Sequence, residues 1–211
     1  AAATAMAAAV PLSLPPVAAD PGHAASPWRD LADVCVHVWR TPHLLAAMCL
    51  AFLVNLTAFP MSAGLLAYVA KDIYGTGQAG LGQLAAAFSF GALIGSLLLM
   101  RYGSQMRCGR MMIGYGAAWY AMLLVFAQVG TPELGIPVLM VAGFAQSLAL
   151  VPMSAMLVRV AGRRYRGGVL GLRMLAVYGL PIGLLAAGPL IERFGFAALA
   201  SGYSVIGLVA I

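Results

Sequence analysis

Long apolar runs without a charged residue constrain the fold of this chain more than any other feature. The segment 79–100, AGLGQLAAAFSFGALIGSLLLM, contains no Asp, Glu, Lys or Arg. About 20 mostly apolar residues in a helix cross the hydrocarbon core of a bilayer. Only 9% of the whole chain is charged and 63% is hydrophobic, whereas a soluble domain has about 25% charged residues. The composition therefore predicts an integral membrane protein.

The same length criterion identifies six candidate spans. None alternates apolar and polar residues over about ten positions, as a lipid-facing barrel strand must. Prolines within the runs are tolerated in membrane helices because neighbouring groups satisfy the freed backbone. We therefore expect an all-α polytopic membrane protein with a six-helix bundle over residues 44–211. The candidate spans are 44–68, 79–100, 111–130, 134–158, 169–191 and a last one from about 196 to the end of the chain.

Residues 1–43 have a different character, with an Ala-rich opening followed by a Pro-rich stretch. We interpret them as the end of a preceding helix and a cytoplasmic linker. Within WRDLADVCVHVWRTPH, apolar side chains recur at helical spacing, which predicts a short amphipathic helix on the membrane surface. The chain lacks an initiator Met, shows no recognisable signal peptide and stops inside an apolar run, so we expect a fragment of a longer protein. The recurring apolar residues are Leu31, Val34, Cys35 and Val38.

The basic residues predict an orientation, because Lys and Arg in short loops mark the cytoplasmic side. Nine arginines occupy alternate breaks, whereas the other breaks hold only Lys71 and Arg193, each beside an acid. We therefore expect a multi-pass protein of the plasma (inner) membrane with a cytoplasmic linker and cytoplasmic basic loops. Nucleic-acid binding is not expected, because it requires basic residues on a solvated face. The predicted topology and cytoplasmic-gate anchors are Arg101, Arg107, Arg110, Arg159, Arg163, Arg164 and Arg166, and Arg29 and Arg40 lie on the same side.

Two short stretches indicate an internal repeat. LLMRYG (98–103) and LIERFG (190–195) match at an offset of 92 residues, which also places Gly91 on Gly183. They close the second and fifth spans, which the charge pattern places on opposite faces of the membrane. This arrangement predicts a 3+3 inverted repeat, as in many secondary transporters. Small residues four apart in these spans predict close helix crossings: Gly91 and Gly95 in the second, and Gly179 and Gly183 in the fifth.

Polar residues within the spans have two possible roles. Asn55, Phe59 and Ser62 follow at i, i+4 and i+7, which places them on one face of an α-helix. Hydrogen bonding between helices explains such residues, and so does the lining of a substrate cavity, and the sequence leaves both open. A transport cavity would be lined by the first, second, fourth and fifth spans. The candidate substrate-pathway residues are Asn55, Phe59, Ser62, Gln83, Gln146, Ser154 and Tyr178.

Charges are nearly absent from the spans themselves. Arg173 is the only charged residue well inside one, and its side chain either extends to the headgroups or faces a pathway. Asp72, Glu133 and Glu192 lie at span ends, so no obvious proton-coupling carboxylate is present.

The sequence contains no equipment for catalysis or cofactor binding. No Ser/His/Asp set and no paired carboxylates are present, and His and Cys lack metal-ligand spacing. We therefore expect no enzyme activity, no cofactor and no metal, and we interpret the three cysteines as small apolar filler. YGTGQAG contains a GxGxxG pattern, but a dinucleotide site needs a strand before it. We expect a turn and a helix start there.

Taken together, the stretches resemble the C-terminal half of a major facilitator superfamily transporter, closest to the bacterial drug and siderophore exporter branch. WRDLADVCVHVWRTPHLLAAMCLAFLVNL resembles the central loop entering the seventh helix. YVAKDIYGTGQAGLGQLAAAFSFGALIGSLLL resembles the turn between the seventh and eighth helices. RYRGGVLGLRMLAVYGLPIGLLAAGPLIERFG resembles the loop before the eleventh helix and that helix itself.

The resemblance implies half of a twelve-helix transporter that works by alternating access and exports small amphiphilic molecules, driven by protons. Its partners would be the lipid bilayer, a small-molecule substrate and an N-terminal half of the same chain. RYGSQMRCGRMM keeps the Gly and Arg positions of a signature of that family but lacks its acid. The alternative is a non-transporting polytopic membrane protein, such as a membrane enzyme subunit or an assembly scaffold.

Overall fold

The computed structural model describes residues 27–103 and 108–211, and within these ranges every regular element is a helix. Five helices are long and apolar enough to cross a membrane, and a sixth apolar helix, Phe196–Ala210, is shorter. The chain is thus a multi-pass α-helical membrane protein, as its composition predicts. The long helices cover Pro42–Ile73, Gly77–Tyr102, Gly109–Gln128, Pro132–Val160 and Tyr165–Phe194.

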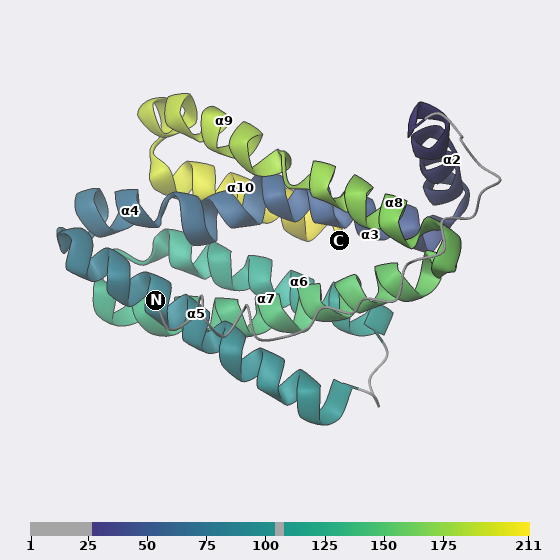
Figure 1. Cartoon of the computed structure of the whole chain (residues 1–211). Coiled ribbons are helices and arrows are strands. Elements are labelled where there is room, and N and C mark those ends of the chain that lie inside the picture. The colour runs from purple at the N-terminus through teal and green to yellow at the C-terminus, as the bar shows by residue number, and fades with distance from the viewer. Residues whose placement is uncertain (1–26, 104–107) are drawn as a thin grey trace, which may run out of the picture.

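Three of the spans are continuous helices that form the centre of the bundle. α7 (Pro132–Val160) packs between α5 (Gly77–Tyr102) and α6 (Cys108–Gln128), and α10 (Phe196–Ala210) covers α6. The helices run along one common direction, with α2 (Pro27–Arg40) turned across them at one end (Figure 1).

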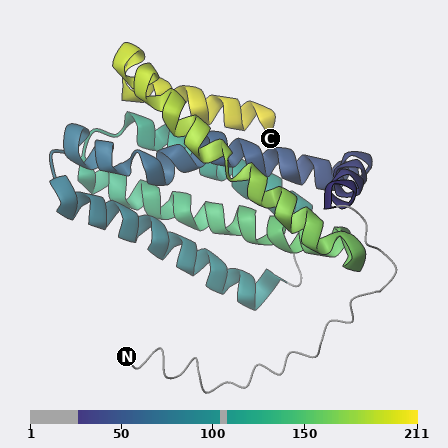
Figure 2. The same cartoon turned by 45° about the horizontal axis from the view of Figure 1, so that its top comes forward.

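The first and fifth spans are divided. The first comprises α3 (Pro42–Leu53), α4 (Leu66–Tyr68) and three π-helical segments, η1 (Val54–Ala58), η2 (Pro60–Gly64) and η3 (Val69–Ile73). The fifth comprises α8 (Gly162–Ala176) and α9 (Gly179–Phe194), which run obliquely across the first span (Figure 2). The two divided spans therefore contact each other.

Proline chemistry explains the irregular first span. Pro60 has no N–H, so it cannot donate to the carbonyl of Leu56 as an α-helix requires. The backbone instead adopts the wider π register, in which the amide of Phe59 donates to Val54 O and that of Leu65 to Pro60 O. The side chains of Asn55, Thr57 and Ser62 each donate to the carbonyl four residues earlier, at 2.8, 2.8 and 2.9 Å. They satisfy backbone acceptors where no water reaches.

The fifth span is divided for a similar reason. Pro181 cannot donate to the carbonyl of Val177, which instead accepts the amide of Leu180 at 3.0 Å, one residue closer than in an α-helix. Val177 and Tyr178 form the turn between the two helices. The division thus lies about one turn beyond Arg173 in α8.

The connections at the two ends of the bundle have different contacts. At one end, Tyr74 donates its hydroxyl to the carbonyl of Val129 at 3.2 Å, which ties the first interhelix connection to the third. Burial raises the pKa of the Tyr74 phenol, so the hydroxyl remains a donor. At the other end, His37 of α2 stacks on Tyr165 of α8 with ring centroids 4.5 Å apart.

α2 covers the stretch predicted to form a short amphipathic helix, and its place on the membrane surface stays a prediction. Val34 and Val38 are buried, but Cys35, predicted on the same apolar face, is exposed. Cys49 of α3 is exposed as well.

Glycines set the spacing between α5 and α7. A Cβ atom at Gly91 would collide with the carbonyl oxygen of Met140, and one at Gly95 would lie 2.8 Å from that of Phe144. In return, a Cβ at Gly143 would collide with the carbonyl oxygen of Phe88. The backbones therefore touch directly, which confirms the close crossing predicted from small residues.

We expect Gly91→Ala to destabilise the full-length protein by about 1–3 kcal/mol, because the new methyl meets a backbone atom that cannot move aside. Gly82→Ala, in the same helix, is the matched control, since its Cβ would enter open space and alanine favours a helix. Thermal unfolding in detergent measures both. Equal melting temperatures for the two variants would contradict the close crossing.

Candidate functional site

A small, partly open cavity lies where the two divided spans meet α7. Its volume is about 210 Å³, below the roughly 300–1,000 Å³ typical of sites for drug-sized ligands. It therefore has room for one end of a molecule. Three of the four spans predicted to line a pathway contribute to it: Ala51, Val54, Asn55 and Phe59 from the first, Leu150 and Met153 from the fourth, and Arg173, Met174 and Val177 from the fifth.

Arg173 supplies the only charge in the lining of this cavity. It lies in the last turn of α8, where the negative end of the helix dipole stabilises a cation by about 0.3–1 kcal/mol. No hydrogen bond or ion pair holds its guanidinium within the described parts of the chain. Arg173 lies eight residues inside the span Tyr165–Phe194. An arginine costs up to about 2.5–3.5 kcal/mol on the insertion scale, the value at the centre of a bilayer. The dipole alone would not offset a cost of that size.

Asn55 contributes a second polar group. Its Nδ2 donates to the carbonyl of Ala51 at 2.8 Å, which uses one of the two amide hydrogens. The second N–H and the carbonyl oxygen of the amide remain for a ligand. Asn55 belongs to η1, and π-helical turns occur frequently at functional sites.

Phe59 forms part of the apolar wall. Its ring meets Trp119 of α6 edge to face, with centroids 5.5 Å apart, and this packing restrains the ring against the buried core. Seven of the nine lining residues are apolar. The cavity thus joins a cation and an amide to apolar surroundings.

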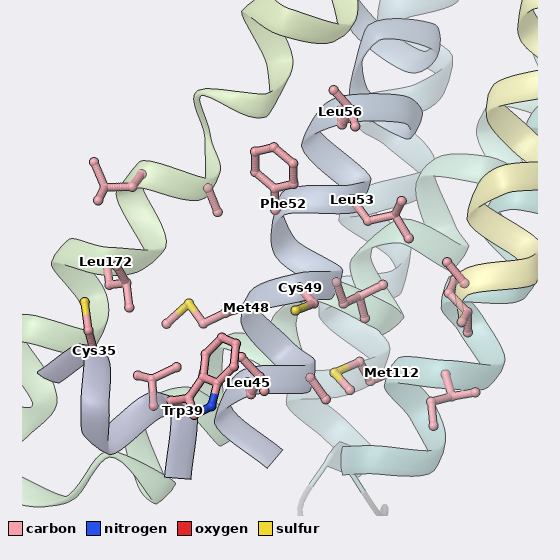
Figure 3. Close-up of a pocket in the computed structure, with 18 residues that line it drawn as sticks. Cys35, Trp39, Leu45, Met48, Cys49, Phe52, Leu53, Leu56, Met112 and Leu172 are labelled. Carbon is pink, nitrogen blue, oxygen red and sulfur yellow. The ribbon is translucent and has the colours of Figure 1, made fainter. Parts of the chain in front are cut away.

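A larger groove opens on the other side of the contact between the first and fifth spans. Its volume is about 930 Å³, and in Figure 3 side chains of α3 project into it between α8 and α6. Its lining is apolar apart from the indole nitrogen of Trp39 and the thiols of Cys35 and Cys49. The groove suits hydrocarbon and offers no charge to a ligand.

The structure brings together two of the seven predicted pathway residues, Asn55 and Phe59. Ser62 is only 1% exposed and lies outside the lining, because the π register between it and Asn55 shifts the face expected of an α-helix. Ser154 is half-buried and donates to the carbonyl of Leu150 at 2.8 Å.

The other three predicted residues do not reach the cavity. Gln83 is exposed on α5, Gln146 is half-buried on α7, and Tyr178 is 66% exposed at the division of the fifth span. The lining of this cavity includes no residue of α5, the second span.

The predicted basic anchors lie at helix ends. Arg101, Arg110, Arg159 and Arg166 are exposed. Arg107 lies outside the described residues, and Arg163 and Arg164 belong to the first turn of α8.

The GxGxxG stretch forms a turn and a helix start, as predicted. Gly75 and Gly77 have φ angles of 66° and 61°, which favour glycine, and α5 begins at Gly77. Within residues 27–103 and 108–211, no three His, Cys, Asp or Glu side chains gather into a possible metal site.

Arg173 is the residue of the lining whose role the sequence left open. Its position in the span was visible, but the division at Val177–Tyr178 that accompanies the cavity was not. The available signal was Pro181, eight residues after Arg173, because a proline leaves a carbonyl four residues earlier without its helical donor.

Comparisons with protein families, with curated proteins and with solved structures give no match. The site is therefore interpreted from its own geometry.

We expect cysteine at positions 55 and 59 to react with a water-soluble thiol reagent, because both side chains line the cavity. Cysteine at position 62 is the internal control and should not react, since Ser62 is buried. The measurement uses the full-length protein with its native cysteines replaced by serine. If neither position 55 nor position 59 is labelled, the predicted pathway is wrong.

Proposed function

We propose that this chain is one half of a secondary active transporter, a proton-driven exporter of small amphiphilic molecules that works by alternating access. In this proposal the six apolar helices form two three-helix units of opposite topology, and a second half completes the transport path. The related packing of the two units is the observation that carries the proposal.

Equivalent glycines make equivalent contacts in the two units. Gly91 of α5 meets the carbonyl oxygen of Met140, and Gly183 of α9 meets that of Leu56. The offset of 92 that relates Gly91 to Gly183 comes from the sequence alone. The contacts add an offset of 84 between the first and fourth spans, which pairs Leu56 with Met140.

A second pair of contacts agrees with the same two offsets. The Cβ built at Gly91 lies 3.0 Å from the backbone nitrogen of Phe144, and the one at Gly183 lies 2.8 Å from Cγ of Pro60. Position 60 plus 84 is position 144. The third and sixth helices, α6 and α10, also fit this pairing. α6 of the first unit packs on α7 of the second unit, and α10 of the second unit packs on η1 of the first. α6 and α10 pack on each other as well.

The two units differ at one position that affects the site. Gly143 lets the carbonyl of Phe88 approach α7 directly. The equivalent position in the first span, 59, carries the phenylalanine that lines the cavity.

The divided spans fit a transport role. Transporters bind substrates near discontinuous helices, where unpaired backbone groups and side chains meet the ligand. Here the two divided spans enclose a cavity with a cation, an amide and apolar walls. These features support a substrate that combines a polar end with an apolar body.

A transport assay tests the proposal. The full-length protein in proteoliposomes, with an imposed pH gradient, should move protons when an amphiphilic dye is added and should move the dye against its concentration gradient. Gly183→Leu should lower the initial rate at least tenfold, because the contact of α9 with η1 is lost. Gly188→Leu, whose side chain enters open space on the same helix, should leave the rate unchanged.

Two results would contradict the proposal. Proteoliposomes in which no tested amphiphile moves and no proton flux appears would favour a scaffold or an enzyme subunit. Equal rates for Gly183→Leu and Gly188→Leu would show that transport does not depend on the contact between α9 and η1.

A further inference from the structure

We propose that Arg173 and Asn55 form a binding site for an oxyanion carried by an amphiphile, with a carboxylate as its simplest form. This inference rests on the proposed function only where it gives the site a role in transport. Binding of the oxyanion itself does not require the protein to alternate between two conformations. The inference assigns a charge to the ligand, which the proposed function does not.

Arg173 brings a fixed positive charge to the lining of the cavity. A guanidinium does not lose its proton in proteins, so it stays cationic inside the span. Its side chain lines a cavity between helices, so an extension to the headgroups does not by itself explain its position. Neither a carboxylate nor a hydrogen-bond acceptor pairs with it within the described residues. An anionic ligand would supply the missing counter-charge.

The hydrogen-bond donors of Arg173 and Asn55 suit the oxygens of an oxyanion. Guanidinium presents a planar fork of N–H donors that matches the two oxygens of a carboxylate. Asn55 retains an N–H beyond its bond to Ala51. Both side chains line the same 210 Å³ cavity. The volume accommodates a headgroup more readily than a whole drug-sized molecule.

The rest of the lining is apolar. Leu150, Met153, Met174, Val177 and Phe59 surround the two polar groups with hydrocarbon, thioether and aromatic surface. A fully hydrated small anion would lose its water there without compensation. An oxyanion joined to an apolar chain gains from both parts of the lining. The site therefore favours amphiphilic anions over inorganic ones.

The site is a joint product of both divided spans. Asn55 occupies η1, and Arg173 lies within one turn of the break at Val177. A regular α-helix at either place would bring different side chains to the contact. A role within its own helix, such as capping, therefore does not fully explain the position of Arg173.

Equilibrium binding of radiolabelled decanoate to the full-length protein in zwitterionic nanodiscs tests the proposal. Decanol, which has the same chain without the charge, and decylamine, which has the opposite charge, are the comparison ligands. Decanoate should bind at least tenfold more tightly than either. This arm needs no variant, so it does not depend on the folding of one.

Variants test the assignment to Arg173. Arg173→Gln should weaken decanoate binding about 10- to 100-fold, the loss expected for hydrogen bonds to a charged group. The decanoate affinity of Arg173→Lys should lie between those of the wild type and Arg173→Gln, because lysine keeps the positive charge but lacks the planar fork of N–H donors. Arg166→Gln is the matched control, since Arg166 lies in the same helix but is exposed and outside the cavity.

Two sources of such an oxyanion exist, a free amphiphile and an anionic lipid of the bilayer. Nanodiscs that contain phosphatidylglycerol distinguish them. If phosphatidylglycerol weakens decanoate binding to the wild type but not to Arg173→Gln, the lipid headgroup is an occupant of the site. Unchanged decanoate binding in these nanodiscs identifies the free amphiphile.

The proposal is overturned if decanoate binds no better than decanol, or if folded Arg173→Gln binds decanoate as the wild type does. Failure of the transport proposal looks different. Arg173-dependent binding without flux of any amphiphile would support the binding site and contradict the proposed transport. Flux without decanoate binding would support the proposed transport and contradict the binding site.

Discussion

Backbone hydrogen bonding in a water-free environment governs this structure. Every carbonyl and amide inside the bilayer needs a partner within the protein, and Pro60 and Pro181 each remove one donor from a span. The first span responds with π-helical turns and side-chain donors such as Thr57, whose hydroxyl also meets that of Tyr120 at 2.7 Å. The fifth span responds by dividing. The cavity lies between these two responses, so the site depends on how the chain satisfies its backbone.

Contact between backbones is the second determinant of the architecture. Because lipid provides no hydrophobic drive for helices to associate, close packing and hydrogen bonds hold them together. α5 and α7 meet through Gly91 and Gly143, and the first and fifth spans meet through Gly183, whose Cβ would collide with the carbonyl oxygen of Leu56.

The apolar runs predicted the helices and the all-α class, because length and hydropathy decide whether a helix can cross lipid. The positions of Gly91 and Gly183 predicted the close crossings. Asn55 and Phe59 line the cavity and Ser62 does not, because α-helical spacing does not hold through π-turns. The sequence left the role of Arg173 open between an extension to the headgroups and a pathway, because it did not reveal the division at Val177 and Tyr178. A break of one or two residues decides which side chains meet, and periodicity does not resolve it.

Alternating access is the central claim, and side-specific labelling at position 55 tests it most directly. Asn55→Cys in the full-length protein, with the native cysteines replaced, is reconstituted in vesicles and treated with a membrane-impermeant thiol reagent from one side at a time. The account predicts that the cysteine reacts from both sides and that reversing the proton gradient shifts the preference between them. Reaction from one side only, unchanged when the gradient is reversed, would contradict it.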